Sequence, residues 1–199
     1  MPQNSRSIRP QLDDRLAFFR GFLERPRQVA SIIPSSRFLE RRLIRATRAG
    51  EAKLIVELGP GTGGTTRALL SAMDPAARLV AIEINPRFVE VLDRWPDERL
   101  TVRQGSATDI TKILDDLGLG APDLVVSGIP FSTMARPLGL EILRAVRDSL
   151  QPGGAFVAYQ VRDRVHTLGR EVFGPATVQT ELLNVPPMRF YRWEKSGPA

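Results

Sequence analysis

The feature that most constrains the fold is an alternation between two hydrophobic patterns that begins near residue 53. Five apolar runs of strand length cover residues 53–59, 78–84, 100–106, 123–129 and 155–161. Segments compatible with helices lie between them, near residues 63–73, 86–94, 110–117 and 137–150. Because strands that alternate with helices are joined by crossover connections, this pattern predicts a parallel sheet with helices on both faces.

The carboxyl-terminal segment follows a different pattern. Residues 177–185 and 188–195 both resemble strands, and Pro186-Pro187 between them predicts a tight turn. Two strands joined in this way pair antiparallel. We therefore expect an α/β fold with a mostly parallel seven-stranded sheet, an antiparallel last strand, helices on both faces and an amino-terminal helical extension.

Composition excludes several classes of protein. The chain has 199 residues, of which 42% are hydrophobic and 25% charged, as in ordinary soluble domains. No run reaches the ~18 uncharged apolar residues of a membrane-spanning helix, and the first ten residues lack the apolar core of a signal peptide. We therefore expect a cytoplasmic protein. The absence of cysteine and the single histidine argue against disulfides and against a metal site.

The formal net charge of +6 is concentrated near the amino terminus. Residues 1–53 contain 12 Lys or Arg and 5 Asp or Glu, a net charge of +7, whereas residues 54–199 contain 16 and 17, a net charge of −1. A positive charge placed in this way indicates a docking surface for an anionic partner, either a nucleic acid or an acidic membrane.

Two helices are expected in this basic segment. In residues 11–24, Phe18, Phe19 and Phe22 belong to a broad apolar face that includes leucines at helical spacing. In residues 34–48, one stripe of the helix consists of Arg37, Arg41, Arg45 and Arg48. An apolar face beside a basic stripe suits the interface of an anionic bilayer. Alternatively, both helices pack on the following domain as a lid, with solvated arginines; the two interpretations are compatible.

A glycine-rich loop, "VELGPGTGGTT" at residues 56–66, follows the first predicted strand and begins the first helix. Backbone N–H groups and the helix dipole at such a place point toward a ligand. The spacing Gly59-x-Gly61-x-x-Gly64 also satisfies the dinucleotide fingerprint. However, Glu57 would repel a pyrophosphate and would attract the ammonium of S-adenosylmethionine. The loop therefore favours S-adenosylmethionine, with a turn that binds no ligand as the alternative.

On these residues the chain resembles the class I S-adenosylmethionine-dependent methyltransferases across residues 50–195. The resemblance rests on "ELGPGTG", the acid in "AIEIN", the acid in "GSATD" and the antiparallel last pair of strands. It implies a Rossmann-like fold, S-adenosylmethionine as cofactor and S-adenosylhomocysteine as product. It also implies that Glu83 binds both ribose hydroxyls and that residues 106–109 flank the adenine. Otherwise, Glu83 is an exposed strand-end acid and Asp109 caps a helix.

The expected cofactor-binding residues lie in the glycine loop and at the ends of the second, third and fourth strands. They are Glu57, Gly59, Pro60, Gly61, Thr62, Gly63, Glu83, Ile84, Ser106, Ala107, Asp109 and Ser127.

The stretch "SGIPF" at residues 127–131 bears on the substrate. In the rRNA adenine dimethyltransferases and in amino-methylating DNA enzymes, which it resembles, an Asn or Asp here accepts hydrogen bonds from the target amino group of a flipped base, and an aromatic stacks on that base. In this chain Gly128 takes the place of the Asn and cannot accept such a bond. An aliphatic amine needs no planar acceptor, so the stretch favours one. Otherwise, it is an ordinary proline turn with Phe131 in the core.

A closer resemblance, to the bacterial phospholipid N-methyltransferases, covers nearly the whole chain. It rests on "RPRQVASIIPSSRFLERRL", "SGIPFS" and "VFGPATVQ…NVPPMRFYRW", in addition to the glycine loop. It implies stepwise methylation of phosphatidylethanolamine toward phosphatidylcholine and peripheral attachment to the inner leaflet of the cell membrane. Residues 1–49 would then be a membrane-associating extension and lid, and residues 50–199 the methyltransferase domain. We expect a monomer.

The chemistry requires an amine without its proton, because an ammonium has no lone pair. Tyr159 and the backbone carbonyls of residues 127–129 are the nearest candidate acceptors, and Phe131 and Tyr159 could hold cationic intermediates by cation–π contact. His166 is a weaker candidate base, and Arg162, Arg164 and Arg170 either neutralise a lipid phosphate or form a solvated helix face. The expected substrate and membrane residues are Ile129, Pro130, Phe131, Arg164, Phe18, Phe19, Phe22, Arg37, Arg41 and Arg45.

Two other functions remain open from the residues alone. One is an rRNA, tRNA or DNA amino-methyltransferase with the basic extension as a nucleic-acid arm. Gly128 and the lack of a separate recognition domain argue against it. The other is a cofactor-binding protein without catalytic activity, against which the intact glycine loop and its acids argue.

Overall fold

The computed structural model describes residues 37–183 and 186–197. The helix predicted over residues 11–24, with Phe18, Phe19 and Phe22, lies outside the described residues, as does the side chain of Arg37. Residues 35–199 belong to one compact unit. Within the part of the chain that is described, every helix is too short or too polar to cross a membrane.

A seven-stranded sheet forms the centre of this unit, with the strand order β3-β2-β1-β4-β5-β7-β6. The first five strands pair in parallel, β7 pairs antiparallel with β5, and β6 pairs antiparallel with β7. The predicted fold, with its antiparallel last strand, is confirmed. The strands are β1 (Leu54–Leu58), β2 (Arg78–Glu83), β3 (Leu100–Gln104), β4 (Leu124–Ser127), β5 (Ala155–Gln160), β6 (Thr177–Glu181) and β7 (Met188–Glu194).

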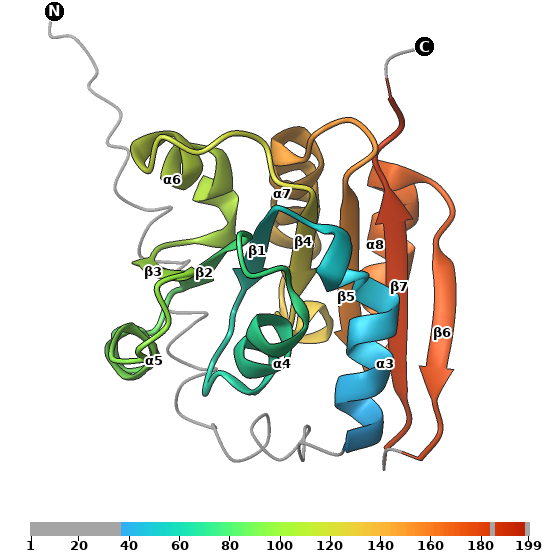
Figure 1. Cartoon of the computed structure of the whole chain (residues 1–199). Coiled ribbons are helices and arrows are strands. Elements are labelled where there is room, and N and C mark those ends of the chain that lie inside the picture. Colours follow the sequence, from blue (N-terminus) through green and yellow to red (C-terminus); the bar gives the residue numbers. More distant parts are fainter. Residues whose placement is uncertain (1–36, 184–185, 198–199) are drawn as a thin grey trace, which may run out of the picture. The chain divides into compact units, whose positions relative to one another are not determined.

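Helices cover both faces of the sheet. Figure 1 shows α3 and α4 in front of the strands and α7 and α8 behind them. The helix α8 lies between β5 and β6, where the hydrophobic pattern alone predicts no element. The helices are α3 (Arg37–Thr47), α4 (Gly64–Ala72), α5 (Pro86–Asp93), α6 (Ile110–Asp116), α7 (Arg136–Ser149) and α8 (Arg164–Phe173), with short 3-10 turns η1 (Ala49–Glu51), η2 (Ala107–Asp109) and η3 (Phe131–Thr133).

The central strands are buried along almost their whole length. Every residue of β4 and β5 is buried, and β1 has one partly exposed residue. This burial explains why these strands have continuous apolar sequences, because helices exclude water from both faces of a parallel sheet. The chain runs from β1 outward to β2 and β3 and then returns to β4 on the other side of β1. In open α/β sheets, ligands bind beside the carboxyl ends of strands at such a reversal.

The helix α3 packs on the sheet beside α4 and contacts β5, β6 and β7. Its buried apolar residues are Leu39, Leu43 and Ala46, whereas Arg41 and Arg45 are exposed. The expected division of residues 34–48 into an apolar face and a basic stripe is therefore correct where side chains are described. The exposed arginines agree both with a packed helix and with a membrane-facing one. The assignment of residues 1–49 to membrane binding stays a prediction.

Candidate cofactor and substrate site

The glycine loop connects β1 to α4 and contains backbone conformations that residues other than glycine rarely adopt. Gly61 and Gly63 have φ values of 56° and 85°, in the left-handed region. A Cβ atom on Gly63 would lie 2.6 Å from side-chain atoms of both Leu92 and Trp95. Gly63 therefore allows the end of α5 and the residues that follow it to pack directly on the loop. The packing of Leu92 and Trp95 therefore supports the loop in addition to its own glycine turn.

Glu83, the last residue of β2, joins this loop to the neighbouring strand. One carboxylate oxygen accepts a hydrogen bond from the backbone N–H of Gly61 at 3.0 Å, and the other accepts one from Asn85 at 2.9 Å. The side chain is only 6% exposed, so the alternative of an exposed strand-end acid is wrong. Burial raises the pKa of Glu83, and the backbone donors oppose this shift. Each oxygen keeps a further lone pair for a hydroxyl donor.

Glu57 lies within β1, directly before the glycine loop, and is 1% exposed. One oxygen, Oε2, accepts a hydrogen bond from the Thr66 hydroxyl at 2.7 Å, whereas the buried Oε1 has no partner among the described residues. Burial raises the pKa of Glu57 to about 8, with a smaller contribution from the charge of Glu83. A buried carboxylate oxygen without a partner is costly unless a ligand supplies a donor. This site therefore fits a cationic group such as the ammonium of S-adenosylmethionine.

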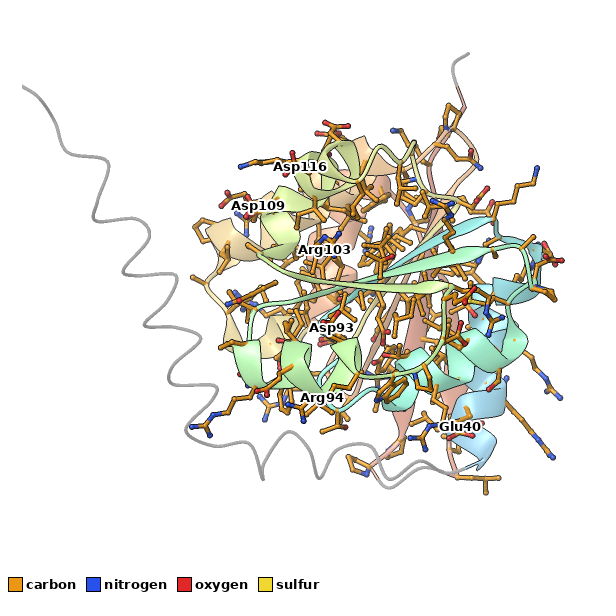
Figure 2. All side chains as sticks on the ribbon, turned by 60° about the vertical axis from the view of Figure 1, so that its left-hand side comes forward. Glu40, Asp93, Arg94, Arg103, Asp109 and Asp116 are labelled. Carbon is orange, nitrogen blue, oxygen red and sulfur yellow. The ribbon has the colours of Figure 1, made fainter. Side chains whose placement is uncertain are left out.

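The segment after β3 is the third part of the site, next to the glycine loop and the end of β2. Ser106 begins η2, and its hydroxyl oxygen accepts hydrogen bonds from the backbone N–H and the hydroxyl of Thr108. Ala107 is buried. Asp109 precedes α6 but makes no side-chain capping bond, so the helix-cap alternative is not supported. Figure 2 shows Asp109 at the beginning of α6, where its side chain is exposed.

We call the residues at the ends of β1, β2 and β3 the cofactor side and those at the ends of β4 and β5 the substrate side. On the substrate side, Ser127 is fully buried, and its hydroxyl oxygen accepts a hydrogen bond from the Ile129 N–H at 3.2 Å. The backbone carbonyl of Ile129 accepts a hydrogen bond from the Gln160 amide. The Ile129 carbonyl, one of the predicted acceptors for the substrate proton, therefore already accepts a hydrogen bond within the protein.

Phe131 is a correction to the expected catalytic residues. Its ring is 0% exposed at the start of η3, so it belongs to the core and presents no face to a substrate. The predicted cation–π role of Phe131 is therefore not supported. Ile129 is also buried, and Pro130 is partly exposed. The turn that contains these residues shapes the substrate side through its backbone.

Tyr159 and Gly128 form the main contact of the substrate side. A Cβ atom on Gly128 would lie 2.5 Å from the Tyr159 hydroxyl oxygen and 3.4 Å from the backbone oxygen of Gly59. The Tyr159 hydroxyl shares a hydrogen bond of 2.8 Å with the Thr65 hydroxyl at the start of α4. The phenol therefore takes the space that a side chain at position 128 would need. It also connects this side to the glycine loop.

Burial raises the pKa of Tyr159, and the nearby charge of Glu57 adds to this shift. The side chain therefore remains a neutral phenol at physiological pH. A neutral phenol can orient an amine through a hydrogen bond, but it is too weak a base to remove the proton of an ammonium group. The expectation that Tyr159 takes this proton is not supported.

The basic residues in and just before α8 lie apart from this contact. Arg162, which precedes the helix, and Arg164 and Arg170 within it are exposed, which agrees with a solvated face. His166 is partly exposed and stacks on Tyr191, with ring centroids 5.2 Å apart. No described contact joins any of these four residues to Tyr159 or to the glycine loop. His166 therefore has a packing role in the described structure.

Three polar residues of the site are absent from the sequence-based expectations. Thr65 contacts the substrate side and Thr66 the cofactor side, although they are neighbours in α4. Gln160 supports the turn after β4 from the end of β5. Two features of the sequence could have indicated these residues: two threonines directly after the glycine loop, and a polar residue at the end of an otherwise apolar strand.

Comparisons with known proteins agree with this geometry. The family described as "Methyltransferase domain" matches residues 55–154. The ornithine lipid N-methyltransferase of Singulisphaera acidiphila is 31% identical over 183 residues, which are 90% of this chain and 95% of that protein. The ribosomal RNA small subunit methyltransferase A of Rhodococcus opacus is 31% identical over 147 residues, 70% of this chain and 47% of that protein. The chain thus spans about half the length of this second relative.

Solved structures share the fold at lower sequence identity. The O-methyltransferase TomG of Streptomyces achromogenes, in complex with S-adenosylmethionine, has a TM-score of 0.65 at 20% identity, over 83% of this chain and 82% of that one. The N-methyltransferase NodS of Bradyrhizobium japonicum, in complex with S-adenosyl-L-homocysteine, has a TM-score of 0.64 at 17% identity, over 81% and 88%. From its sequence, its fold and its glycine loop, the chain belongs to the class I S-adenosylmethionine-dependent methyltransferases.

Proposed function

We propose that the protein transfers methyl groups from S-adenosylmethionine to the headgroup amine of a membrane lipid. The proposed substrates are phosphatidylethanolamine and its methylated intermediates, and the final product is phosphatidylcholine. The match to an ornithine lipid N-methyltransferase over almost the full length of both proteins supports a lipid amine. The observation that carries the proposal is the Gly128–Tyr159 contact.

This contact argues against a nucleobase as the substrate. A flipped base presents a planar amino group, and recognition of such a group relies on a fixed side-chain acceptor. Gly128 supplies no side chain, and a Cβ atom there would lie 2.5 Å from the Tyr159 hydroxyl oxygen. An aliphatic amine is tetrahedral and can approach a single hydroxyl without a planar partner. The substrate side therefore suits a headgroup amine better than a base.

The residues of the cofactor side fit S-adenosylmethionine. The unpaired oxygen of Glu57 would hold the ammonium of its amino-acid end, and the remaining lone pairs of Glu83 would accept the ribose hydroxyls. When bound, this cofactor supplies a methyl group that its sulfonium has already activated. The protein then has to align the amine and exclude water, which accounts for much of the rate enhancement in such reactions.

On the substrate side, Tyr159 would orient the amine. The hydrogen bond between the Thr65 and Tyr159 hydroxyls restricts where the phenol oxygen lies, so the amine would meet a fixed partner. The headgroup has to lose its proton before transfer. Because Tyr159 stays neutral, we propose that the amine reaches the site already deprotonated, and the rate of methylation should rise with pH until the headgroup amine is neutral.

The test is a methylation assay with the purified full chain and radiolabelled S-adenosylmethionine. Vesicles of phosphatidylethanolamine and phosphatidylglycerol should incorporate label in the lipid fraction, whereas total RNA should not. Vesicles that contain ornithine lipid instead of phosphatidylethanolamine are the matched control. Label in ornithine lipid alone would contradict the proposed headgroup, and label in RNA alone would contradict a lipid substrate altogether.

We also propose peripheral attachment to an anionic membrane surface through residues 11–24. A change of Phe19 and Phe22 together to Asp should then weaken binding to anionic vesicles even at low salt. Each fully buried Phe contributes about 1.5–3 kcal/mol, although partial insertion reduces this value. Cosedimentation of the double variant at the wild-type level would show that this segment does not insert.

A further inference from the structure

Two neighbouring leucines at the end of β6 are the most exposed of the large apolar side chains in the described residues. Leu182 is 73% exposed and Leu183 is 67% exposed. We call this pair the leucine tip. Pro187, on the other arm of the same turn, is exposed as well. Adjacent exposed leucines are unfavourable in water, so the tip requires an explanation.

The leucine tip is held in place by a buried carboxylate. Glu181, the last residue of β6, is 7% exposed. One of its oxygens accepts a hydrogen bond from the backbone N–H of Leu183 at 3.1 Å, and the other accepts one from Nε of Arg42 on α3 at 3.3 Å. The ion pair is partly buried, because the Arg42 side chain is 32% exposed and that of Glu181 only 9%. This arrangement fixes the backbone of the tip against the helix.

The strand register places the leucine tip at the edge of the sheet that carries the site. Glu181 pairs with Met188, and Arg189 pairs with Gln160 at the carboxyl end of β5. The tip therefore lies beyond the carboxyl end of β5, the strand that contains Tyr159. Figure 1 shows the end of β6 and the beginning of β7 at the lower end of the sheet, near the beginning of α3.

The surroundings of the leucine tip are mainly basic. Arg189 is exposed at the start of β7, and Arg41 is exposed on α3 beside the Arg42 that pairs with Glu181. The nearby acid Glu40, labelled in Figure 2, is partly exposed on the same helix. An apolar tip flanked by arginines is complementary to an anionic bilayer, where arginines meet the headgroups and leucines reach the acyl chains.

We propose that the leucine tip inserts into the interface of an anionic lipid bilayer and holds this edge of the sheet against the membrane. This inference rests on the proposed function, because a lipid amine can reach Gly128 and Tyr159 only if this edge faces the bilayer. A stable protein partner would bury about 800 Å² on each side, far more than two leucines offer. A bilayer needs no such extended complementary surface.

The test uses the full chain and substitutions that leave its net charge unchanged. The variant Leu182→Asn with Leu183→Asn should bind vesicles of equal parts phosphatidylethanolamine and phosphatidylglycerol at least about tenfold more weakly than wild type. The matched control is Val91→Asn with Val178→Asn, since these valines are also exposed. The control should bind like wild type. Equal binding of the leucine variant and wild type would overturn the proposal.

Failure of this inference and failure of the proposed function give different results. Vesicle binding is measured without S-adenosylmethionine, so it tests the leucine tip alone. A water-soluble short-chain phosphatidylethanolamine should be methylated equally by wild type and by the leucine variant. If wild type methylates neither form of the lipid, the proposed function fails. If the leucine variant loses self-association instead of vesicle binding, the tip contacts a second copy of the chain and the proposal is overturned.

Insertion of the leucine tip can also be measured directly, by tryptophan fluorescence. The variant Leu183→Trp adds a third tryptophan to the two in the chain. Its additional fluorescence should be quenched by vesicles that contain brominated lipids, which quench only within the acyl region. The same vesicles should leave the emission of wild type largely unchanged. Absence of quenching while the protein is bound would overturn the proposal.

Discussion

The cofactor side and the substrate side of the site are built in different ways. The cofactor side depends on the continuous glycine loop and on the carboxylate of Glu83 from the next strand. This carboxylate accepts hydrogen bonds from the backbone N–H groups of Gly61 and Asn85. The substrate side depends on contacts between distant residues: the hydrogen bond between Thr65 and Tyr159 joins positions 94 residues apart. The cofactor side is a preformed set of buried carboxyl oxygens and backbone groups that a ligand completes. The substrate side is defined by the space that Tyr159 takes from position 128.

The largest expected effect comes from Glu83→Ala. This change removes the acceptor for the ribose hydroxyls and for the N–H groups of Gly61 and Asn85. Because hydrogen bonds to charged groups contribute about 1.5–3 kcal/mol each, we expect cofactor affinity to fall by about 3 kcal/mol. Calorimetric titration with S-adenosylhomocysteine measures this loss, with Glu90→Ala as a control on an exposed acid. Wild-type affinity would remove Glu83 from the site.

Two smaller effects are expected from Glu57→Gln: the cofactor-free protein should become more stable, and cofactor binding should become weaker. The folded pKa of Glu57 is about 8 against a reference value of 4.5, so the folded state binds its proton more tightly than the unfolded state does. The resulting stabilisation is complete below about pH 4.5 and is lost as the pH rises through about 8. The neutral amide should avoid this loss. At pH 8 we expect the cofactor-free variant to be more stable than wild type by about 1–3 kcal/mol.

The same variant should bind the cofactor more weakly, by about 2 kcal/mol, because the amide lacks the charge that attracts an ammonium. Urea unfolding between pH 5 and pH 9, with and without S-adenosylmethionine, measures both effects. If the stability of wild type and variant changes with pH in parallel, Glu57 does not titrate as the structure indicates.

A third effect concerns the substrate side alone. Gly128→Ala should clash with the Tyr159 hydroxyl and lower the rate of lipid methylation, and Tyr159→Phe should relieve part of the clash. We expect a coupling of about 1 kcal/mol between the two changes in the free energy of unfolding. Either change should lower cofactor affinity less than Glu83→Ala does, because both lie on the substrate side and reach the glycine loop only through Thr65 and the backbone oxygen of Gly59. Additive effects would show that the two residues are independent.

A salt-dependent effect is expected outside both sides of the site. Replacement of Arg41 and Arg45 by Ala should weaken binding to anionic vesicles by about 1 kcal/mol per residue at low salt, and the difference should vanish as salt screens the charges. Vesicle cosedimentation across a salt series measures this. A difference that persists at high salt would mean that these arginines contribute by packing instead of by charge.

The two sides also differ in how well they could be predicted from the sequence. Residues 53–59 were expected as a strand and form β1 (Leu54–Leu58), because a parallel strand covered on both faces needs a continuous apolar run. The bounds of α8 were not predicted, although its buried residues Val165, Leu168 and Gly169 have helical spacing and Gly174 follows its last residue. Phe131 was misassigned because a motif shows which aromatic follows a strand but not which way its ring faces.

The sequence by itself determined the order of elements, the parallel sheet, the glycine loop and the acids that accompany it, because each follows from local spacing of residue types. Only the tertiary structure decided that Glu83 is buried between two backbone donors, that Glu57 has an oxygen without a partner, and that the Tyr159 hydroxyl takes the space a side chain at position 128 would need. These properties depend on distances between strands. Such distances arise from packing, which no single segment of the chain encodes.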